Sequence, residues 1–165
     1  MMKSSPMTDH AAHEHDVNRR LASVWRDSRL GPTVEKLRRH VLRDGDVEIE
    51  LAHYRVLHAL SEHGSMAMRT LANTVGSTQS SVSRSVQRLE ERGLVTRTQS
   101  SDDLRSFTIA LTAHGVEFHD YLMVRAFDVY GDIFAVFSIA ERQTLAALME
   151  RLLKSADSVL DDRGS

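Results

Sequence analysis

Hydrophobic residues recur at helical spacing through most of this chain. Apolar positions three and four apart predict a helix over residues 16–30, and Gly31-Pro32 breaks it. Proline suits the first turn of a helix, so a second helix is expected over residues 32–42. A third is predicted over residues 49–63, with Gly64 placed to end it. The N-terminal half is therefore expected to be helical, with its breaks at glycine and proline.

Two longer helices are predicted near the C-terminus. Thr112 is a suitable N-cap for a helix that runs into the 130s, and Ser138 with Glu141 has the spacing of a capping box. The capping box opens a last helix that extends to about residue 160. Its apolar stripe consists of Leu145, Leu148, Met149, Leu152, Leu153 and Val159.

The middle of the chain departs from this pattern. A short helix over residues 68–75, the turn Gly76-Ser77 and a longer helix over residues 78–92 are followed by a β-hairpin. The hairpin strands are residues 94–97 and residues 107–111, and in the second strand apolar and other positions alternate with a period of two. The fold class predicted is mainly α with a small β-hairpin wing, a winged helix-turn-helix. In such a fold the second helix enters the major groove of DNA.

The helix over residues 78–92 has two different faces. At about 100° per residue, Val82, Val86 and Leu89 fall together on one side. Hydroxyl, amide and guanidinium groups, which can hydrogen-bond base edges and phosphates, occupy much of the rest. An ordinary solvated helix is the alternative, but serine and threonine are poor choices for such a surface unless their hydroxyls are used. The predicted DNA-binding residues here are Thr78, Gln79, Ser80, Ser81, Ser83, Arg84, Gln87 and Arg88.

The hairpin tip, residues 99–106, adds two further candidates. Arg105 is suited to the negative potential of a minor groove, and Asp103 to bracing the tip or orienting that arginine. A solvated turn explains the same residues, and the tip alone does not decide between the two interpretations.

Composition narrows the possible functions. The net charge is -2, yet residues 66–111 contain six arginines and only four acidic residues. The chain has no cysteine, which removes disulfides, thiolate zinc sites and thiol redox sensing and is consistent with the cytoplasm. Aromatic residues are 5% of the chain, which argues against recognition of single strands by base stacking. No apolar run is long enough to span a bilayer, and the polar N-terminus is no signal peptide.

Chemistry other than DNA binding has little support. The sequence shows no phosphate loop, nucleophile elbow or clustered carboxylate pair, so it does not predict an enzyme or a cofactor. His10, His13 and His15 lie close together in residues 1–15. They are compatible with a surface metal site, but a disordered polar tail is favoured because nothing rigid would hold the ligands.

Several linked motifs resemble those of the MarR family of regulators. They are Leu71-Ala72, Gly76, Ser80-Ser81-Val82-Ser83-Arg84, Leu89-Glu90-Glu91-Arg92-Gly93-Leu94-Val95, Asp103-Leu104-Arg105 and Leu111-Thr112-Ala113-His114-Gly115, with His53-Tyr54-Arg55-Val56-Leu57 in the preceding helix. The resemblance covers about residues 47–116. It implies a homodimer that binds double-stranded DNA at a pseudo-palindromic operator. The implied organisation is a tail (1–15), N-terminal dimerisation helices (16–46), the DNA-binding lobe (47–112) and C-terminal dimerisation helices (113–165).

The resemblance also implies a ligand-responsive repressor. Members of this family often sense small aromatic anions between the dimer helices and the DNA-binding lobe. Candidates for such an effector pocket are Trp25, His53, Arg55 and His58. Packing and surface charge explain each of them as well, and Trp25 is as suited to a dimer interface. A winged helix that binds protein instead of DNA is a further alternative, but it calls for apolar residues where this helix has Ser, Gln and Arg.

Overall fold

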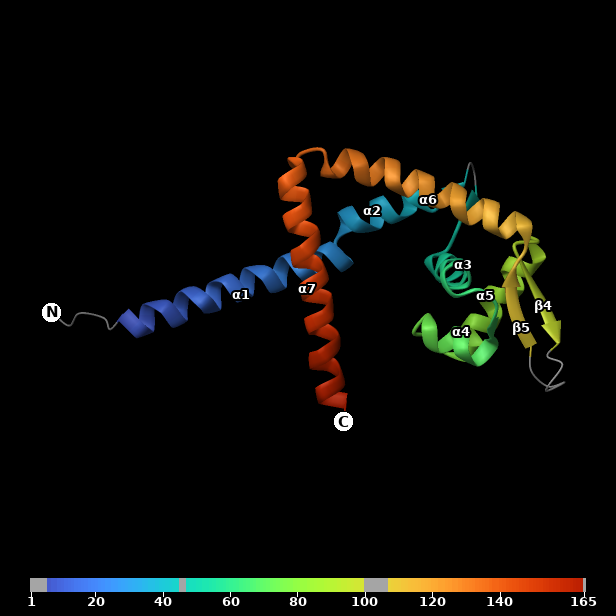
Figure 1. Cartoon of the computed structure of the whole chain (residues 1–165), viewed down its shortest axis with the longest axis horizontal. Coiled ribbons are helices and arrows are strands. Elements are labelled where there is room, and N and C mark those ends of the chain that lie inside the picture. The colour runs from blue at the N-terminus through green and yellow to red at the C-terminus, as the bar shows by residue number, and fades with distance from the viewer. Residues whose placement is uncertain (1–5, 45–46, 100–106, 165) are drawn as a thin grey trace. The chain divides into compact units, whose positions relative to one another are not determined.

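The computed structural model describes residues 6–44, 47–99 and 107–164 (Figure 1). The chain forms two compact units, Met1–Asp120 and Tyr121–Ser165. Helix α1 is Pro6–Leu30 and helix α2 is Pro32–Val41. Gly31 is the N-cap of α2 and its N–H donates to the carbonyl of Asp27 at 2.9 Å, while Pro32 takes the first helical position. The predicted break between these helices is confirmed.

The predicted disorder of residues 1–15 is wrong from Pro6 onward, where the chain is already helical. The sequence between Pro6 and Gly31 contains no further proline and no glycine, and Ala11 and Ala12 are strong helix formers. Nothing in this stretch therefore stops the helix of residues 16–30 from continuing toward the N-terminus.

Two very short strands follow α2. Strands β1, Arg43–Asp44, and β2, Val47–Glu48, pair antiparallel, with Arg43 opposite Glu48. The sequence predicted only that the second helix ends near residue 42. A strand of two residues leaves no alternation to detect, so this pairing had no sequence signal.

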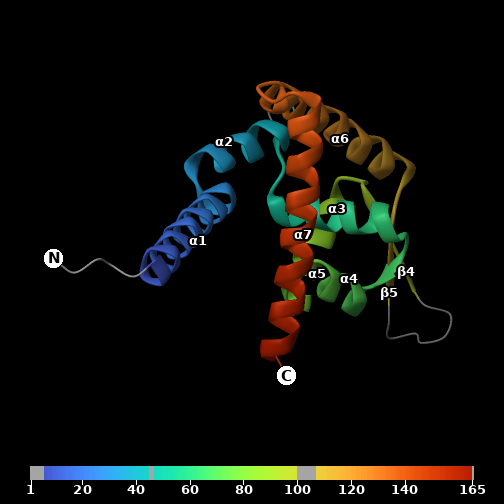
Figure 2. The same cartoon turned by 60° about the vertical axis from the view of Figure 1, so that its left-hand side comes forward.

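The next six elements form the helix-turn-helix and its sheet (Figure 2). They are α3, Leu51–His63; β3, Met66–Ala67; α4, Met68–Thr74; α5, Gln79–Glu91; β4, Val95–Gln99; and β5, Phe107–Leu111. The sheet is antiparallel in the order β3-β5-β4, with Met66 opposite Ile109 and Val95 opposite Leu111. The predicted helices and hairpin are confirmed. Strand β3 was missed, for the same reason as β1 and β2.

One apolar core joins these elements. Leu57 from α3, Leu71 from α4, Val86 and Leu89 from α5 and Ile109 from β5 are each 0% exposed. Burial of such a side chain stabilises a fold by about 1.5–3 kcal/mol. This core therefore fixes the helix-turn-helix to the sheet.

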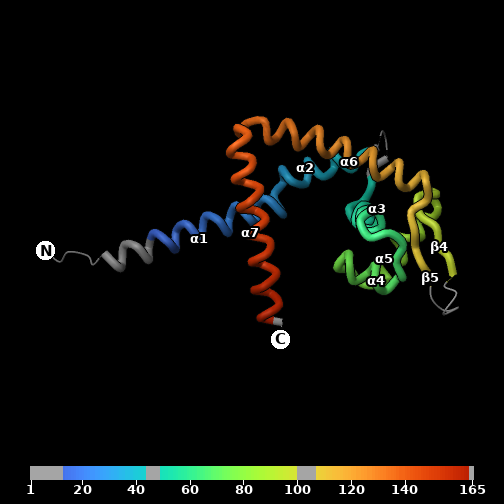
Figure 3. Tube along the Cα trace, in the orientation of Figure 1, coloured from blue at the N-terminus to red at the C-terminus, as the bar shows by residue number. Residues whose placement is uncertain are grey.

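The last two helices are long. Helix α6, Ala113–Phe134, begins in the first unit and continues into the second, and α7, Ile139–Gly164, follows (Figure 3). Both predicted caps are confirmed. The Thr112 hydroxyl accepts from the N–H of Gly115 at 2.9 Å, and the Ser138 hydroxyl donates to the Glu141 carboxylate at 2.7 Å. Across the residues described, no helix is both long and apolar enough to cross a membrane.

The start of α6 yields a test of packing. Gly115 lies against the backbone of Leu94, so a Cβ at this position would overlap the Leu94 carbonyl oxygen. Gly115→Ala is expected to lower the free energy of unfolding by about 1–3 kcal/mol, because backbone must move. Gly131, in the same helix, has no neighbour within 4 Å of such a Cβ. Gly131→Ala is the control and should raise stability by roughly 0.5–1 kcal/mol in urea unfolding. Equal effects of the two substitutions would contradict this account.

Candidate nucleic-acid interface

The orientation of α5 is set by its cap and its buried face. Thr78 is the N-cap and its hydroxyl accepts from the N–H of Ser81 at 3.3 Å. Val82, Val86 and Leu89 are at most 2% exposed. The predicted buried face is confirmed, with one addition, since Ser85 is also buried at 6% exposure. The spacing of Ser85 from Val82 and Leu89 places it on this face, but it was left out of the predicted buried face because serine is polar.

The opposite face of α5 is exposed and rich in donors. Gln79, Ser80, Arg84, Gln87 and Arg88 are exposed, while Ser81 and Ser83 are half-buried. The first turn contains no acidic residue. The N-terminal end of the helix therefore presents hydroxyls, an amide and free backbone N–H groups together, a combination suited to phosphate and base edges.

The two arginines on this face differ in their surroundings. Within the described chain Arg84 forms no ion pair and no side-chain hydrogen bond, so its guanidinium has five unused donors. Arg88 instead donates to Glu91 at 3.3 Å, and Gln87 donates to the same carboxylate at 3.2 Å. Arg84 is thus the guanidinium most available for a ligand on α5.

The wing is only partly described. Strands β4 and β5 hold the hairpin in register from Val95 opposite Leu111 to Gln99 opposite Phe107. Asp103 and Arg105 lie outside the described residues. Their predicted contact with DNA stays a prediction.

Arg97 was missed by the sequence analysis. It lies on β4, and its Nη2 donates to the main-chain carbonyl of Ser83 at 3.4 Å, while its Nε lies 3.3 Å from the Glu90 carboxylate. The signal was available, because side chains two apart on a strand share a face. Arg97 follows the buried Val95 by two residues and so faces α5.

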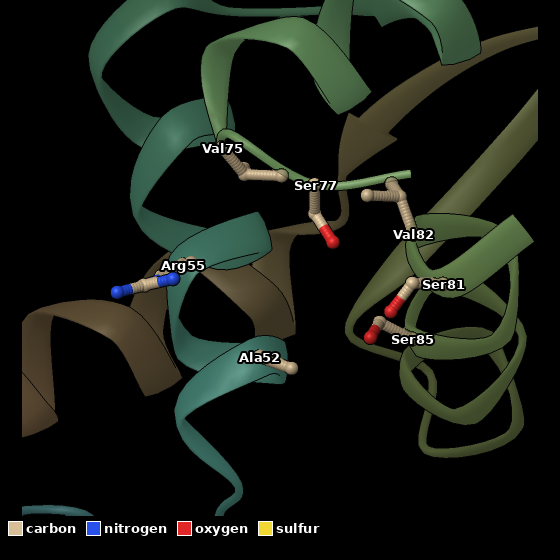
Figure 4. A pocket seen from close by; sticks show the side chains of 7 residues that line it. All are labelled: Ala52, Arg55, Val75, Ser77, Ser81, Val82 and Ser85. Atoms are coloured by element: carbon tan, nitrogen blue, oxygen red, sulfur yellow. The ribbon is translucent and has the colours of Figure 1, made fainter. Parts of the chain in front are cut away.

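A small cavity lies beside α5 (Figure 4). Its volume is about 40 Å³, enough for a few water molecules. The hydroxyls of Ser77, Ser81 and Ser85 point toward the space between α3 and α5, whereas the guanidinium of Arg55 points away from it. Arg55 is exposed on α3, on the far side of this cavity from Ser81 and Ser85.

The four effector candidates have different surroundings. Trp25, on α1, is half-buried and packs under the Arg29 guanidinium at 5.5 Å from the ring centre. His53, on α3, is half-buried, and burial is the main reason that its pKa lies below the usual value. His58 contacts His119 instead. The structure thus gives these residues separate neighbours, and their predicted role as an effector pocket stays untested.

His58 and His119 form an aromatic cluster with Tyr54. His58 Nδ1 lies 3.3 Å from His119 Nε2, and the Tyr54 ring stacks on His58 with 5.7 Å between ring centres. His119 is 4% exposed, and its Nδ1 lies 3.6 Å from the Asp120 carboxylate without a hydrogen bond. Burial lowers the pKa of His119, and the Asp120 carboxylate opposes that shift. The cluster joins α3 to the first turns of α6.

Of the three N-terminal histidines, His13 and His15 have described side chains. His13 and His15 are exposed, and His15 lies 3.3 Å from Arg19, the residue one helical turn further along α1. The side chain of His10 is outside the described part. Over the described residues, no group of three or more histidine or carboxylate side chains is arranged to hold a metal ion.

Comparison with known proteins relates part of the chain to a family. A sequence model of the MarR family matches residues 48–106. A protein of Thauera aromatica named for transcriptional regulation of the hcr operon is 30% identical over 101 residues, 61% of each chain. The chain thus spans less than two thirds of that relative. The homoprotocatechuate degradative operon repressor of Escherichia coli is 28% identical over 109 residues, 66% of this chain and 74% of the relative.

Solved structures agree on the fold. The MarR family transcription regulator SP03579 superposes with a TM-score of 0.74 at 18% identity, covering 91% of this chain and 98% of that chain. PcaV from Streptomyces coelicolor, solved in complex with its natural ligand, gives a TM-score of 0.58 at 24% identity, covering 94% of this chain and 99% of that chain.

The helix-turn-helix, the hairpin and these likenesses together define a winged helix-turn-helix fold, which this chain shares with solved structures of MarR family regulators. Residues 48–106, which contain the helix-turn-helix, are similar to the MarR family.

The buried histidine predicts a pH dependence of stability. The unfolded His119 has its ordinary pKa of 6.5, while the folded value is lower. The unfolded chain therefore binds this proton more readily, and stability is lost as the pH falls below 6.5 toward the folded pKa. In urea unfolding between pH 5 and pH 8, His119→Gln should lose less stability on acidification than the wild-type protein. The exposed His63 provides the control, and His63→Gln should follow the wild-type curve. Identical curves for wild type and His119→Gln would exclude this role for His119.

Proposed function

We propose that this chain is a sequence-specific DNA-binding repressor that acts as a homodimer on a pseudo-palindromic operator. The observation that carries the proposal is the exposed, donor-rich face of α5, opposite the buried Val82, Val86 and Leu89. A second helix of a helix-turn-helix reads base edges in the major groove. The repressor name of the Escherichia coli relative favours repression over activation.

The chemistry of the α5 face supports DNA over a protein partner. Guanidinium groups pair with guanine or phosphate, and amide groups with adenine. Arg84, Gln79 and Gln87 supply these groups, and Ser80 near the helix start is small enough for close approach. A protein-binding winged helix would need apolar anchors at this face, and the residues described there are polar.

Exposed apolar side chains on the long helices support the homodimer. Many large hydrophobic residues on α1, α6 and α7 are 38–81% exposed in the single chain, among them Leu21 and Val24, Phe127, Ile133 and Phe134, and Ile139, Leu148, Leu152 and Leu153. Soluble monomers rarely expose so much apolar surface. A second copy of the chain, related by a two-fold axis, would cover it and set two copies of α5 about one DNA turn apart.

Response to a ligand is the finer part of the proposal. The fold is shared with PcaV, which was solved with its natural ligand. By analogy, a small aromatic or anionic effector would bind this chain near Arg55, His53, His58 or Trp25. Such binding would weaken DNA affinity by changing the spacing of the two lobes, since both half-sites must be met together.

Arg84 tests the DNA-binding face. Arg84→Ala should weaken operator binding by about 1–3 kcal/mol while leaving the free energy of unfolding unchanged, because the side chain is exposed. The measurement is fluorescence anisotropy with a labelled duplex from the region upstream of the protein's own gene. Lys36 on α2 is also exposed, and Lys36→Ala serves as the control for removal of one cation. A folded protein that binds no such duplex at low salt would refute the proposed function.

Leu152 tests the dimer. It is 46% exposed on α7, so Leu152→Glu places a charge on an already accessible surface of the single chain. Sedimentation velocity should show dissociation to the monomer, since an unpaired charge would be buried on association. Arg151→Glu, at the neighbouring exposed position, is the control and should remain dimeric. A monomeric wild-type protein at micromolar concentration would contradict the homodimer.

A further inference from the structure

One side chain connects the wing to the recognition helix. Arg97 on β4 donates from Nη2 to the carbonyl of Ser83, and its Nε lies 3.3 Å from the carboxylate of Glu90. Ser83 and Glu90 are seven residues apart on α5, which is about two helical turns. The guanidinium therefore bridges two separate points along the helix.

The environment of Arg97 requires these partners. Its side chain is 26% exposed, and Nε is buried without a well-aligned hydrogen bond. A buried cation is costly without a neighbouring acceptor or anion, so the Glu90 carboxylate and the Ser83 carbonyl together compensate its burial. The planar fork of arginine can meet two acceptors at once, which a lysine ammonium does not do with the same geometry.

The position of Arg97 relates this bridge to DNA contact. The carbonyl that it holds belongs to the residue immediately before Arg84, the available guanidinium of α5. On the strand, Arg97 pairs with Ile109, which is 0% exposed and anchors the hairpin in the core. The same strand ends at Gln99, where the wing tip begins. Arg97 therefore fixes the strands of the wing to the part of α5 that faces DNA.

We propose that Arg97 is a positioning residue for operator recognition, which keeps the recognition helix and the wing in one rigid arrangement without itself touching DNA. The proposal rests on the proposed function. Phosphate contacts need only nearby cations, whereas base contacts need each element in its correct place. Loss of the bridge should therefore weaken binding to the operator and leave binding to unrelated DNA unchanged.

The experiment compares two duplexes. The operator is obtained by selection from a random duplex library with the wild-type protein, and the second duplex is a scrambled sequence of equal length. Arg97→Met should reduce the ratio of operator to scrambled affinity by about tenfold and leave the salt dependence of binding unchanged. Arg97→Lys should reduce this affinity ratio by about as much, because lysine keeps the charge but lacks the planar guanidinium that meets two acceptors. Thr98→Ala, at the exposed neighbour on β4, is the control and should retain the wild-type ratio.

Glu90→Gln provides a second variant at a residue that is 42% exposed. It removes the ion pair from the helix side, so Glu90→Gln alone should also lower the ratio of operator to scrambled affinity. Where Arg97→Met folds, the Arg97→Met/Glu90→Gln double variant should lower that ratio no further than Arg97→Met alone. This variant keeps the test decisive if Arg97→Met does not fold.

Three results would overturn the inference. Arg97 would be a phosphate contact if Arg97→Met lost equal affinity for both duplexes and reduced the salt slope of binding by about one, and if Arg97→Lys restored the affinity. An unchanged affinity ratio with a lower free energy of unfolding would make its role structural. Failure of the wild-type protein to select any DNA would instead refute the proposed function itself, and the inference with it.

Discussion

The burial of one face of α5 determines what the other face presents. Val82, Val86 and Leu89 are packed into the core with Leu57, Leu71 and Ile109, so the helix cannot rotate without exposing them. Because side chains on a helix have fixed angular positions, this packing forces Arg84, Gln87 and Arg88 outward. The hydroxyl of Thr78 then fixes where the helix begins. The polar surface proposed to contact DNA is thus a consequence of how the apolar core is filled.

Local chemistry made most of this fold predictable. The caps at Thr112 and Ser138 and the break at Gly31-Pro32 depend on residues at most four positions apart, and the structure confirms each. The two-residue strands β1, β2 and β3 were not predictable, because they exist only through pairing with a partner strand. The start of α1 at Pro6 was missed because a polar composition was taken to indicate disorder, although it does not exclude a helix.

The candidate site was predictable only in part, for a related reason. Helical periodicity separated the exposed Arg84 from the buried Val86 without any knowledge of tertiary structure. The contact between His58 and His119 joins residues 61 positions apart, and that between Arg97 and Ser83 joins residues 14 positions apart. Such pairs depend on how α3, α6, β4 and α5 pack, which no local pattern specifies. The residues proposed for an effector pocket came from the family resemblance, and no local pattern indicated whether packing would bring them together. The structure gives them separate neighbours.

The apolar side chains exposed on α6 and α7 make the fraction of assembled protein depend on protein concentration, if they form the proposed dimer interface. In the proposed homodimer, part of the stabilising burial is a bimolecular event, so the assembled fraction follows the law of mass action. Dilution would separate the copies and return surfaces such as those of Phe127 and Leu148 to water. DNA occupancy would then rise more steeply than in proportion to protein concentration, because each binding unit requires two chains. The abundance of the chain would thereby become a variable of its regulation, independent of any ligand.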